Sequence, residues 1–544
     1  MVKKIGLILI AILIASTCVY AQGNKRIPFF PNPQLGGLNT SVSPLILDAK
    51  NLTKADNVLY DQIGTRIKRG GMLYLNESSM APTESSGSNT VMGIYDYRKL
   101  AADGAATRKL IAHADGKVYK MDDFDGTWDD ISSGALPLTV DVPVDYAILR
   151  KADTTVDTLI MVNGQETPQT WNQSDTTISE LSGTPSGVDF YPSVIEFHNS
   201  RLFVSGVPSY PYRVYYSAAY KHDDWNTVDD AGYVDIIDSF GSKVVGLKGG
   251  YFGYLLVFSE QSISRISGSS ILDFSTNALF EIGAVSNASI VRAGNDIYWV
   301  SEKGIHSLST TEKYGDILGA YISAPIQKDF NALNKSRLKY CCGQSWEELN
   351  YIIWSFSEGG QTTNNICFVY DYLGDRWSKW TGVNASSFAI VYNSSGTREL
   401  VAGDYDGFVQ RLNRTDHSDN GIAYSFTIRT PHINLGDFIL SKNFEELFMF
   451  MRPQGNSTLD VIYSIENQTS EMLEFSQKGT SAVLGSFVLG IDKLGGGSLV
   501  PRSRSMKGTG KTIQLTIAQD GINEESEIYG FAIECTEADI DYSN

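Results

Sequence analysis

One acidic stretch holds the residues most able to do chemistry. In MDDFDGTWDD, carboxylates at alternate positions could bind calcium, a cation that prefers oxygen ligands. The stretch lacks the remaining spaced ligands of a helix–loop–helix calcium loop, so a solvated acidic turn is the stronger interpretation. The same two interpretations apply to Asp404 and Asp406 in GDYDGF. The carboxylates of the first stretch are Asp122, Asp123, Asp125, Asp129 and Asp130.

A second candidate is GTGKT, Gly508 to Thr512, which resembles the end of a phosphate-binding loop. Ser505 stands where that motif requires its first glycine, and the strand-like run Ile513 to Ile517 follows where a helix should begin. The histidines are scattered, with no pair at metal-ligand spacing: His113, His198, His222, His306, His417 and His432. From these observations together we predict no catalytic, cofactor-binding or metal-ligating residue, no cofactor and no enzymatic activity.

Length and composition indicate which elements must position any site. A chain of 544 residues predicts two or more domains, or one large domain built of repeats. Its 50 glycines, 29 tyrosines and 24 phenylalanines favour many short strands with tight turns, so we predict an all-β fold. The net charge of −18 argues against gripping nucleic acid through its phosphates, because that contact requires a basic face.

The first 21 residues look like a secretory signal. Lys3 and Lys4 precede the apolar run Ile5 to Ala15, and Val19-Tyr20-Ala21 offers a cleavage site before Gln22. The run is short for a membrane span, and a retained anchor or an unprocessed segment are the alternatives. Cleavage would leave four cysteines, which are too few for a disulfide framework. We expect no bridge between the adjacent Cys341 and Cys342, and a buried thiol at Cys367. The four cysteines are Cys341, Cys342, Cys367 and Cys535.

Strand–turn–strand units recur from about Val91 onward. The spacings between their starts are 49, 43, 53, 42, 54 and 49 residues. A hairpin at this spacing in every unit is typical of propeller blades. We predict a β-propeller-like body of six or seven blades, with one or several β-sandwiches as the alternative. The units begin near Lys109, Thr158, Arg201, Tyr254, Asp296, Asn350 and Glu399.

The segment Phe197 to Trp225 is the clearest of these units. Arg201 to Ser205 and Tyr212 to Ser217 are predicted to pair across a loop with glycine and two prolines. Glycines in Asp115-Gly116, Lys303-Gly304 and Asp406-Gly407 are expected to take positive φ in turns. Tryptophans follow several hairpins and are expected to fill the wedges between blades: Trp128, Trp171, Trp225, Trp377 and Trp380.

Four regions follow from these patterns. Residues 1–21 are the signal-like segment, residues 22–90 an extended arm with a hairpin, residues 91–416 the body, and residues 417–544 a second domain resembling a β-sandwich. Carbohydrate binding by that domain is a hypothesis from its strand pattern alone. Its loop Leu494 to Thr509 is expected to be exposed and protease-sensitive at LVPRS. The domain's expected strands are Ser425–Ile428, Glu446–Met451, Ser457–Ile465, Thr512–Ala518 and Glu527–Cys535.

Several phrases resemble a family of tailed-bacteriophage proteins, the tail nozzle or tail tubular protein of short-tailed phages. GGLN at 36–39 and DNVLYDQIGTRIKRGG at 56–71 resemble the opening arm and hairpin of that family. FHNSRLFVSGVPSYPYRVYYS, LLVFSEQSISRISG at 255–268 and NDIYWVSEKGIHSL at 295–308 follow in order. The likeness extends over roughly residues 33–413.

The resemblance implies a virion component in a homo-oligomeric ring around the DNA exit channel, joined to adaptor and fibre proteins. DNA would pass an acidic lumen without specific binding, in agreement with the net charge.

The signal-like segment departs from this family, because virion parts assemble in the host cytoplasm. It could instead be an apolar anchor retained inside the particle, through which a membrane could be contacted, or the true start could lie downstream of it. The alternatives are a secreted cellular β-propeller that binds or adheres, and a propeller-type glycoside hydrolase, whose converging carboxylates no sequence pattern reveals.

Overall fold

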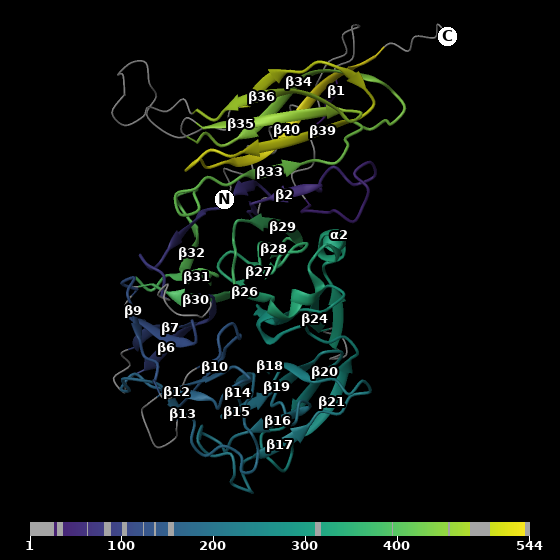
Figure 1. The fold of residues 1–544 in the computed structure, drawn as a ribbon. Helices are drawn as coiled ribbons and strands as arrows, with labels where there is room; N and C mark the ends of the chain where they lie inside the picture. The colour runs from purple at the N-terminus through teal and green to yellow at the C-terminus, as the bar shows by residue number, and fades with distance from the viewer. Residues whose placement is uncertain are drawn as a thin grey trace, which may run out of the picture. The chain divides into compact units, whose positions relative to one another are not determined.

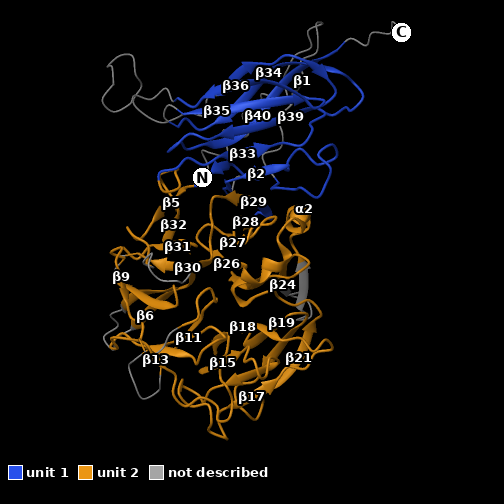
Figure 2. Ribbon diagram, in the orientation of Figure 1, with its two compact units in different colours: residues 1–69, 374–378, 421–544 blue, residues 70–373, 379–420 orange. Residues whose placement is uncertain are grey.

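A computed structural model presents the chain as almost entirely β-structure (Figure 1). Contacts divide it into two compact units (Figure 2). The propeller unit comprises residues 70–373 and 379–420, and the smaller unit comprises residues 1–69, 374–378 and 421–544. The structure describes residues 27–29, 36–61, 64–80, 89–100, 106–122, 124–134, 138–150, 157–310, 317–393, 395–454, 457–478 and 501–538.

Between residues 71 and 414 the described strands form seven blades of four antiparallel strands, so the fold is a seven-bladed β-propeller. Blade 1 consists of β6 (Val91–Leu100), β7 (Ala106–Ala114), β8 (Lys117–Asp122) and β9 (Trp128–Asp130). Blade 2 consists of β10 (Asp145–Arg150), β11 (Asp157–Val162), β12 (Gln169–Trp171) and β13 (Ser179–Glu180). Blade 3 consists of β14 (Val194–His198), β15 (Arg201–Ser205), β16 (Arg213–Tyr216) and β17 (Gly232–Asp235).

Blades 4 to 6 continue the same order along the chain. Blade 4 consists of β18 (Val244–Tyr251), β19 (Tyr254–Ser259), β20 (Ile263–Ser267) and β21 (Ser275–Phe280). Blade 5 consists of β22 (Val291–Ala293), β23 (Asp296–Val300), β24 (Ile305–Thr310) and β25 (Ile317–Tyr321). Blade 6 consists of β26 (Cys342–Trp346), β27 (Tyr351–Phe356), β28 (Ile366–Asp371) and β29 (Arg376–Thr381). The short 3₁₀ helix η1 (Asn287–Ser289) precedes β22, and α2 (Gln327–Asn331) and the 3₁₀ helices η2 (Ala324–Ile326) and η3 (Lys335–Tyr340) lie between β25 and β26.

Blade 7 closes the ring with strands from both ends of the propeller sequence. Its strands β30 (Ser387–Tyr392), β31 (Arg398–Gly403) and β32 (Val409–Arg414) follow blade 6, and its outermost strand is β5 (Gly71–Tyr74). Antiparallel pairing of Leu73 with Arg411 ties the start of the propeller to its end. The first strand of blade 7 also contacts the first strand of blade 1, β6. This closure removes the free sheet edges that an open array would expose.

The recurring hairpins are confirmed, and each is the second and third strand of one blade. The pair β15 and β16 aligns Phe203 with Tyr216, within the segment identified as the clearest unit. The pair β7 and β8 aligns His113 with Val118 across the turn Asp115-Gly116. Seven hairpins therefore mark seven blades, the upper of the two predicted counts.

Apolar side chains fill the wedges between neighbouring blades. Trp171 of blade 2 packs in one cluster with Tyr97 and Ile111 of blade 1, and Trp225 packs where blades 2 and 3 meet. These two tryptophans confirm the predicted wedge positions. Trp377 and Trp380, on β29, are buried, whereas Trp128 is only partly buried against the cluster between blades 7 and 1.

The turn glycines follow the prediction at two of the three positions. Gly116 and Gly407 have positive φ, of 66° and 84°. Gly304 does not, so the prediction is wrong there. Glycine is needed at position 304 because of crowding, since a Cβ there would lie 2.3 Å from the ring of Tyr321.

The smaller unit contains two sheets, each with one buried face. One sheet has the order β3 (Val58–Tyr60), β4 (Arg66–Lys68), β40 (Glu527–Glu537), β34 (Lys442–Met451) and β37 (Arg502–Ser505), with β1 (Ile27–Phe29) on β40 and β38 (Thr509–Gly510) on β34. The other includes β2 (Lys54–Asp56), β33 (Phe426–Arg429), β39 (Ile513–Gln519), β35 (Thr458–Ile465) and β36 (Gln468–Ser476). Buried and exposed residues alternate along β35 and β39, as in a β-sandwich.

The five strands predicted for this region are confirmed as β33, β34, β35, β39 and β40, and β3 with β4 confirms the predicted N-terminal hairpin. The predicted loop 494–509 is wrong at Arg502–Ser505, which pairs with β34 as β37, because Leu447 and Met449 of that strand offer a ladder partner. Residues 494–500, and the signal-like residues 1–21, lie outside the described residues.

Candidate functional site

The first strands of the blades surround a central cavity of about 1090 Å³ in the propeller unit. Strands β6, β10, β14, β18, β26 and β30 line it, and η1 supplies the lining of blade 5. Connections between second and third strands, including residues 163–165 and 362–363, line it as well. The volume is slightly larger than that of most small-molecule sites, which is about 300–1,000 Å³.

Asp145 is a partly buried acid of the cavity wall. Its Oδ2 accepts a hydrogen bond from the backbone N–H of Ile195 at 2.8 Å and another from the Asn287 side-chain amide at 2.8 Å. Burial raises the pKa of Asp145 to about 6, although the positive charge of Lys248 opposes this shift. The carboxyl group therefore changes charge near neutral pH.

An aromatic pair lies next to this acid. The rings of Tyr95 and Tyr146 stack with centroids 5.2 Å apart, and the hydroxyl of Tyr146 lies 2.7 Å from Nδ1 of His113. Burial lowers the pKa of His113 to about 3, so its ring is neutral. Gly93 allows this arrangement, because a Cβ there would lie 2.3 Å from the Tyr146 hydroxyl oxygen.

Positive charge exceeds negative charge along the cavity wall. Four cationic residues line it, against two carboxylates, in a chain with 44 basic and 62 acidic residues. Arg337 lies with its guanidinium carbon 3.9 Å from the centroid of the Tyr340 ring, and its buried Nε has no hydrogen-bond partner within the described part of the chain. The charged lining residues are Lys243, Lys248, Arg337, Lys339, Asp141 and Asp145.

A second candidate site is an apolar surface on blades 3 and 4, which we call the loop face. It consists of Phe197, Tyr220, Phe252 and Leu272, and Leu272 is 94% exposed. The Tyr220 N–H donates to Ser200 O at 2.7 Å, which ties the loop of Tyr220 to the tight turn Asn199-Ser200 that follows Phe197. Exposed apolar residues gathered in this way are typical of a protein contact.

Hydrogen bonds tie the same turn to blade 4. The Asn199 amide donates to the carbonyl of Gly268 at 3.1 Å, next to the loop that carries Leu272. That loop is anchored by Phe274, whose ring packs 5.9 Å from Phe203 and 5.0 Å from Tyr216, between centroids. The backbone N–H of Gly250 donates to Nδ1 of His198 at 3.3 Å, beside the turn that carries Phe252.

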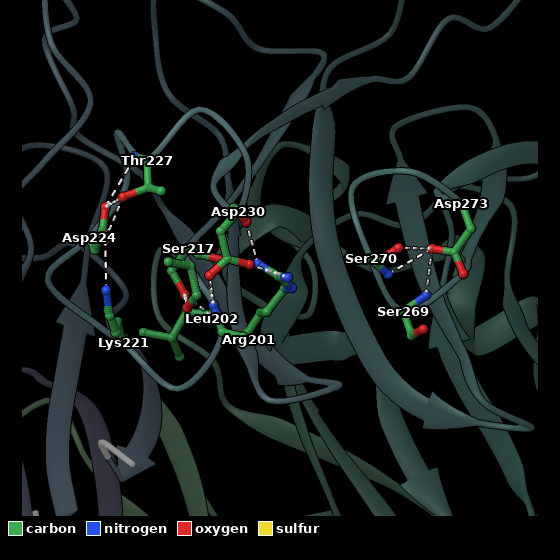
Figure 3. Close-up of polar contacts among 12 residues, drawn as sticks. Arg201, Leu202, Ser217, Lys221, Asp224, Thr227, Asp230, Ser269, Ser270 and Asp273 are labelled. Carbon is green, nitrogen blue, oxygen red and sulfur yellow. Dashed lines mark hydrogen bonds and ion pairs between the residues drawn. The ribbon is translucent and has the colours of Figure 1, made fainter. Parts of the chain in front are cut away.

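Aspartates fix the two longer loops of the loop face (Figure 3). Arg201 donates to Asp230 Oδ1 at 2.5 Å and to the Ser217 carbonyl at 2.9 Å. Asp273 Oδ1 accepts from the N–H groups of Ser269 and Ser270, at 3.0 and 2.7 Å. The loops are therefore held in shape before any partner binds.

The acidic residues identified from the sequence have structural partners. Asp122 pairs with Lys109 at 2.8 Å, and Asp129 pairs with Lys120 at 3.0 Å. Asp130 pairs with Lys117, and Asp125 accepts a backbone hydrogen bond from Thr127. Asp123 lies outside the described residues. Among the residues that the structure describes, no group of three or more metal-ligating side chains gathers.

The remaining candidates also occupy structural positions. Asp404 is buried and accepts from the N–H groups of Asp406 and Phe408 at 2.9 and 2.8 Å, which shapes the turn before β32. GTGKT leads into strand β39, as its sequence predicted, and not into a helix. The cysteines at 341, 342, 367 and 535 are buried and unbridged, which confirms the expectation for Cys367 and the adjacent pair. No helix in the described ranges is long and apolar enough to cross a bilayer.

Similarity to known proteins is found among solved structures. No family profile matches the sequence, and no curated protein matches it significantly. Among solved structures it is similar to virginiamycin B lyase from Staphylococcus aureus, with 14% identity, a TM-score of 0.40, and coverage of 63% of this chain and 98% of that one. It is also similar to BBS1N in complex with ARL6DN, with 11% identity, a TM-score of 0.39, and coverage of 64% of this chain and 98% of that one. A third similar structure is YCF48 from Cyanidioschyzon merolae, with 10% identity, a TM-score of 0.37, and coverage of 63% of this chain and 99% of that one. We rest the propeller assignment on the seven blades and their closure.

Proposed function

We propose that this β-propeller protein is a structural component of a bacteriophage tail, one subunit of a homo-oligomeric ring around the DNA exit channel. The observation that carries the proposal is the preorganised loop face of blades 3 and 4. An apolar surface on fixed loops loses little conformational entropy when a neighbour covers it. The ordered likeness to tail nozzle proteins over residues 33–413 supports the same role.

In this role the protein is mechanical and not catalytic. The loop face would contact the neighbouring subunit of the ring, and the chain's negative charge would let DNA pass without specific binding. We propose no cofactor and no reaction for it.

The first test is the native mass of the purified assembly, compared for the parent protein and Leu272→Ser. We expect a ring of several copies, which Leu272→Ser converts largely to monomers because a polar side chain weakens the apolar contact. Leu373→Ser is the matched control, since Leu373 is 67% exposed on a loop of blade 6, away from the loop face. A parent protein that is monomeric at high concentration would overturn the ring.

A second candidate function is a secreted cellular propeller that binds or adheres to a partner. The signal-like pattern at residues 1–21 favours it, and the loop face would serve as its binding surface. The intact mass of the chain, together with its oligomeric state, distinguishes the tail component from the secreted propeller. A chain that begins at Gln22 and remains a monomer supports the secreted protein, whereas an uncleaved chain in a ring supports the tail component.

A further inference from the structure

We propose that the central cavity of the propeller binds a small acidic saccharide, a carboxylated sugar of about one to three units. This site is separate from the loop face and does not depend on the ring. The cavity lies among the first strands of the blades, with Asp145, Lys248 and Arg337 on its wall.

The sign of the charge points to an anionic ligand. The wall carries four cationic residues and two carboxylates, the reverse of the balance in the chain. Lys243 is paired with Glu260 at 3.1 Å, but Lys248 makes no hydrogen bond or ion pair with any described residue. Asp145 is already bonded to Ile195 and Asn287. Lys248 acts on Asp145 through its charge but bonds to neither of its oxygens, and a cation in a concave, partly open cavity attracts an anion more strongly than one on a flat surface.

Two further cations on the wall can attract a carboxylate. Arg337 keeps its guanidinium over the Tyr340 ring, with the buried Nε unpartnered. Lys339 lies near the same ring, its Nζ 5.0 Å from the centroid. Another part of the Arg337 side chain hydrogen-bonds to Tyr405, and the buried Nε is closed to solvent, so the positive charges of Arg337 and Lys339, and not the Nε, would attract a carboxylate.

The remaining lining suits a sugar ring with hydroxyl groups. The stacked rings of Tyr95 and Tyr146 provide an aromatic wall, against which the apolar face of a sugar can pack. Gln344, Thr362 and Thr363 line the cavity and present groups that both donate and accept hydrogen bonds. A bare inorganic anion would use the cations and leave this part of the wall without contacts.

The test is isothermal titration calorimetry of the full-length protein with trigalacturonic acid. Maltotriose serves as the uncharged match, and inorganic phosphate and adenosine monophosphate serve as other anions. We expect binding of trigalacturonic acid that weakens at higher salt, and at least about tenfold weaker binding of each of the other three. Phosphate or the nucleotide binding as tightly as the saccharide would overturn the assignment to acidic sugars, as would absence of saccharide binding.

Variants place the ligand in the cavity. Lys248→Met and Arg337→Met should each weaken binding of trigalacturonic acid about tenfold or more, because each removes one charge-assisted contact. Lys221→Met is the matched control, since Lys221 is an exposed lysine paired with Asp224 at 3.2 Å in a loop between β16 and β17. Thr363→Val changes a cavity-lining residue but leaves all charges in place, so it should weaken binding of trigalacturonic acid less than Lys248→Met or Arg337→Met does. Because this change removes no charge, it tests whether the ligand occupies the cavity without relying on a charge substitution that could disturb folding. Equal affinity for the parent, Lys248→Met and Arg337→Met proteins would overturn the proposed site.

Discussion

At the scale of single residues, buried polar groups decide how firmly the loops of the propeller are held. Arg201 is 5% exposed and satisfies three acceptors, two of them on Asp230. It joins the start of β15 to the loop after β16. Loss of the Arg201 guanidinium would leave the buried Ser217 without this donor to its carbonyl, whereas Asp230, with 36% of its side chain exposed, could regain hydrogen bonds from water.

We therefore predict that Arg201→Met lowers the free energy of unfolding by about 1 to 3 kcal/mol, as measured by urea titration. Arg398→Met is the matched control, since Arg398 is exposed and lies 3.6 Å from Glu347. An exposed pair of this kind contributes at most about 1 kcal/mol. Equal losses for the two variants would mean that the Arg201 network does not stabilise the loop.

A second residue-scale prediction concerns pH. Burial lowers the pKa of His113 to about 3, below its unfolded value near 6.5, so the unfolded chain takes up a proton more readily as the pH falls. Stability from His113 is therefore present at pH 7 and is lost as the pH falls through 6.5 toward 3. Asp145 acts in the opposite direction, because its raised pKa of about 6 makes the folded state gain stability as the pH falls from 6 toward 4.

His113→Asn should remove only the first of these effects. We expect the loss of unfolding free energy between pH 7 and pH 4 to be smaller in His113→Asn than in the parent protein, by about 3 kcal/mol. His417→Asn is the control for replacing a histidine elsewhere in the chain. Identical pH profiles for the parent and His113→Asn would mean that His113 is not the group that resists protonation.

At the scale of elements, the closure of blade 7 depends on one side chain next to β5. Asn76 is 2% exposed and accepts from the Val409 N–H at 2.9 Å, while its amide donates to the carbonyls of Ser78 and Gly407. The Leu75 N–H adds a bond to the Val409 carbonyl at 2.7 Å. These contacts hold the first strand of the propeller on its last hairpin.

Asn76→Ala should therefore weaken the closure, at a cost of about 2 to 3 kcal/mol for the buried partners that it leaves unpaired. We expect hydrogen exchange to accelerate in β30, β31 and β32 and to change little in blades 3 and 4. Asn172→Ala, which alters a partly exposed turn of blade 2, is the control. Uniform acceleration over all blades would show that the ring opens as one unit and not at blade 7.

The blade hairpins were predictable because their signal is local. The second and third strands of several blades are apolar and separated by short turns, so β19 with β20 and β23 with β24 stand out in the sequence. The closing strand β5 was not predictable, since it has four residues, two of them exposed, and pairs with a strand more than 300 residues away. The cavity was missed for the same reason, because Asp145, Lys248 and Arg337 meet only through the ring of blades. A cue that sequence reasoning could have used is that each lies at or before the first strand of a blade.

At the scale of the whole molecule, net charge decides whether the protein can hold DNA. With 62 acidic and 44 basic residues, its long-range field repels a phosphate backbone, and the basic residues of the cavity are too few to reverse this. A tail component that lets DNA pass needs this property, since a protein that neutralises phosphates holds DNA in place.

We predict that the assembled protein does not retain double-stranded or single-stranded DNA in a gel-shift assay at about 150 mM salt. Lowering the salt should not produce binding, because weaker screening strengthens repulsion between like charges, whereas a basic protein would bind more tightly. A basic DNA-binding protein in the same buffers is the control for the assay. Retention of DNA that increases steeply as salt falls would reveal a basic surface produced by assembly, and would exclude passage of DNA through an acidic channel.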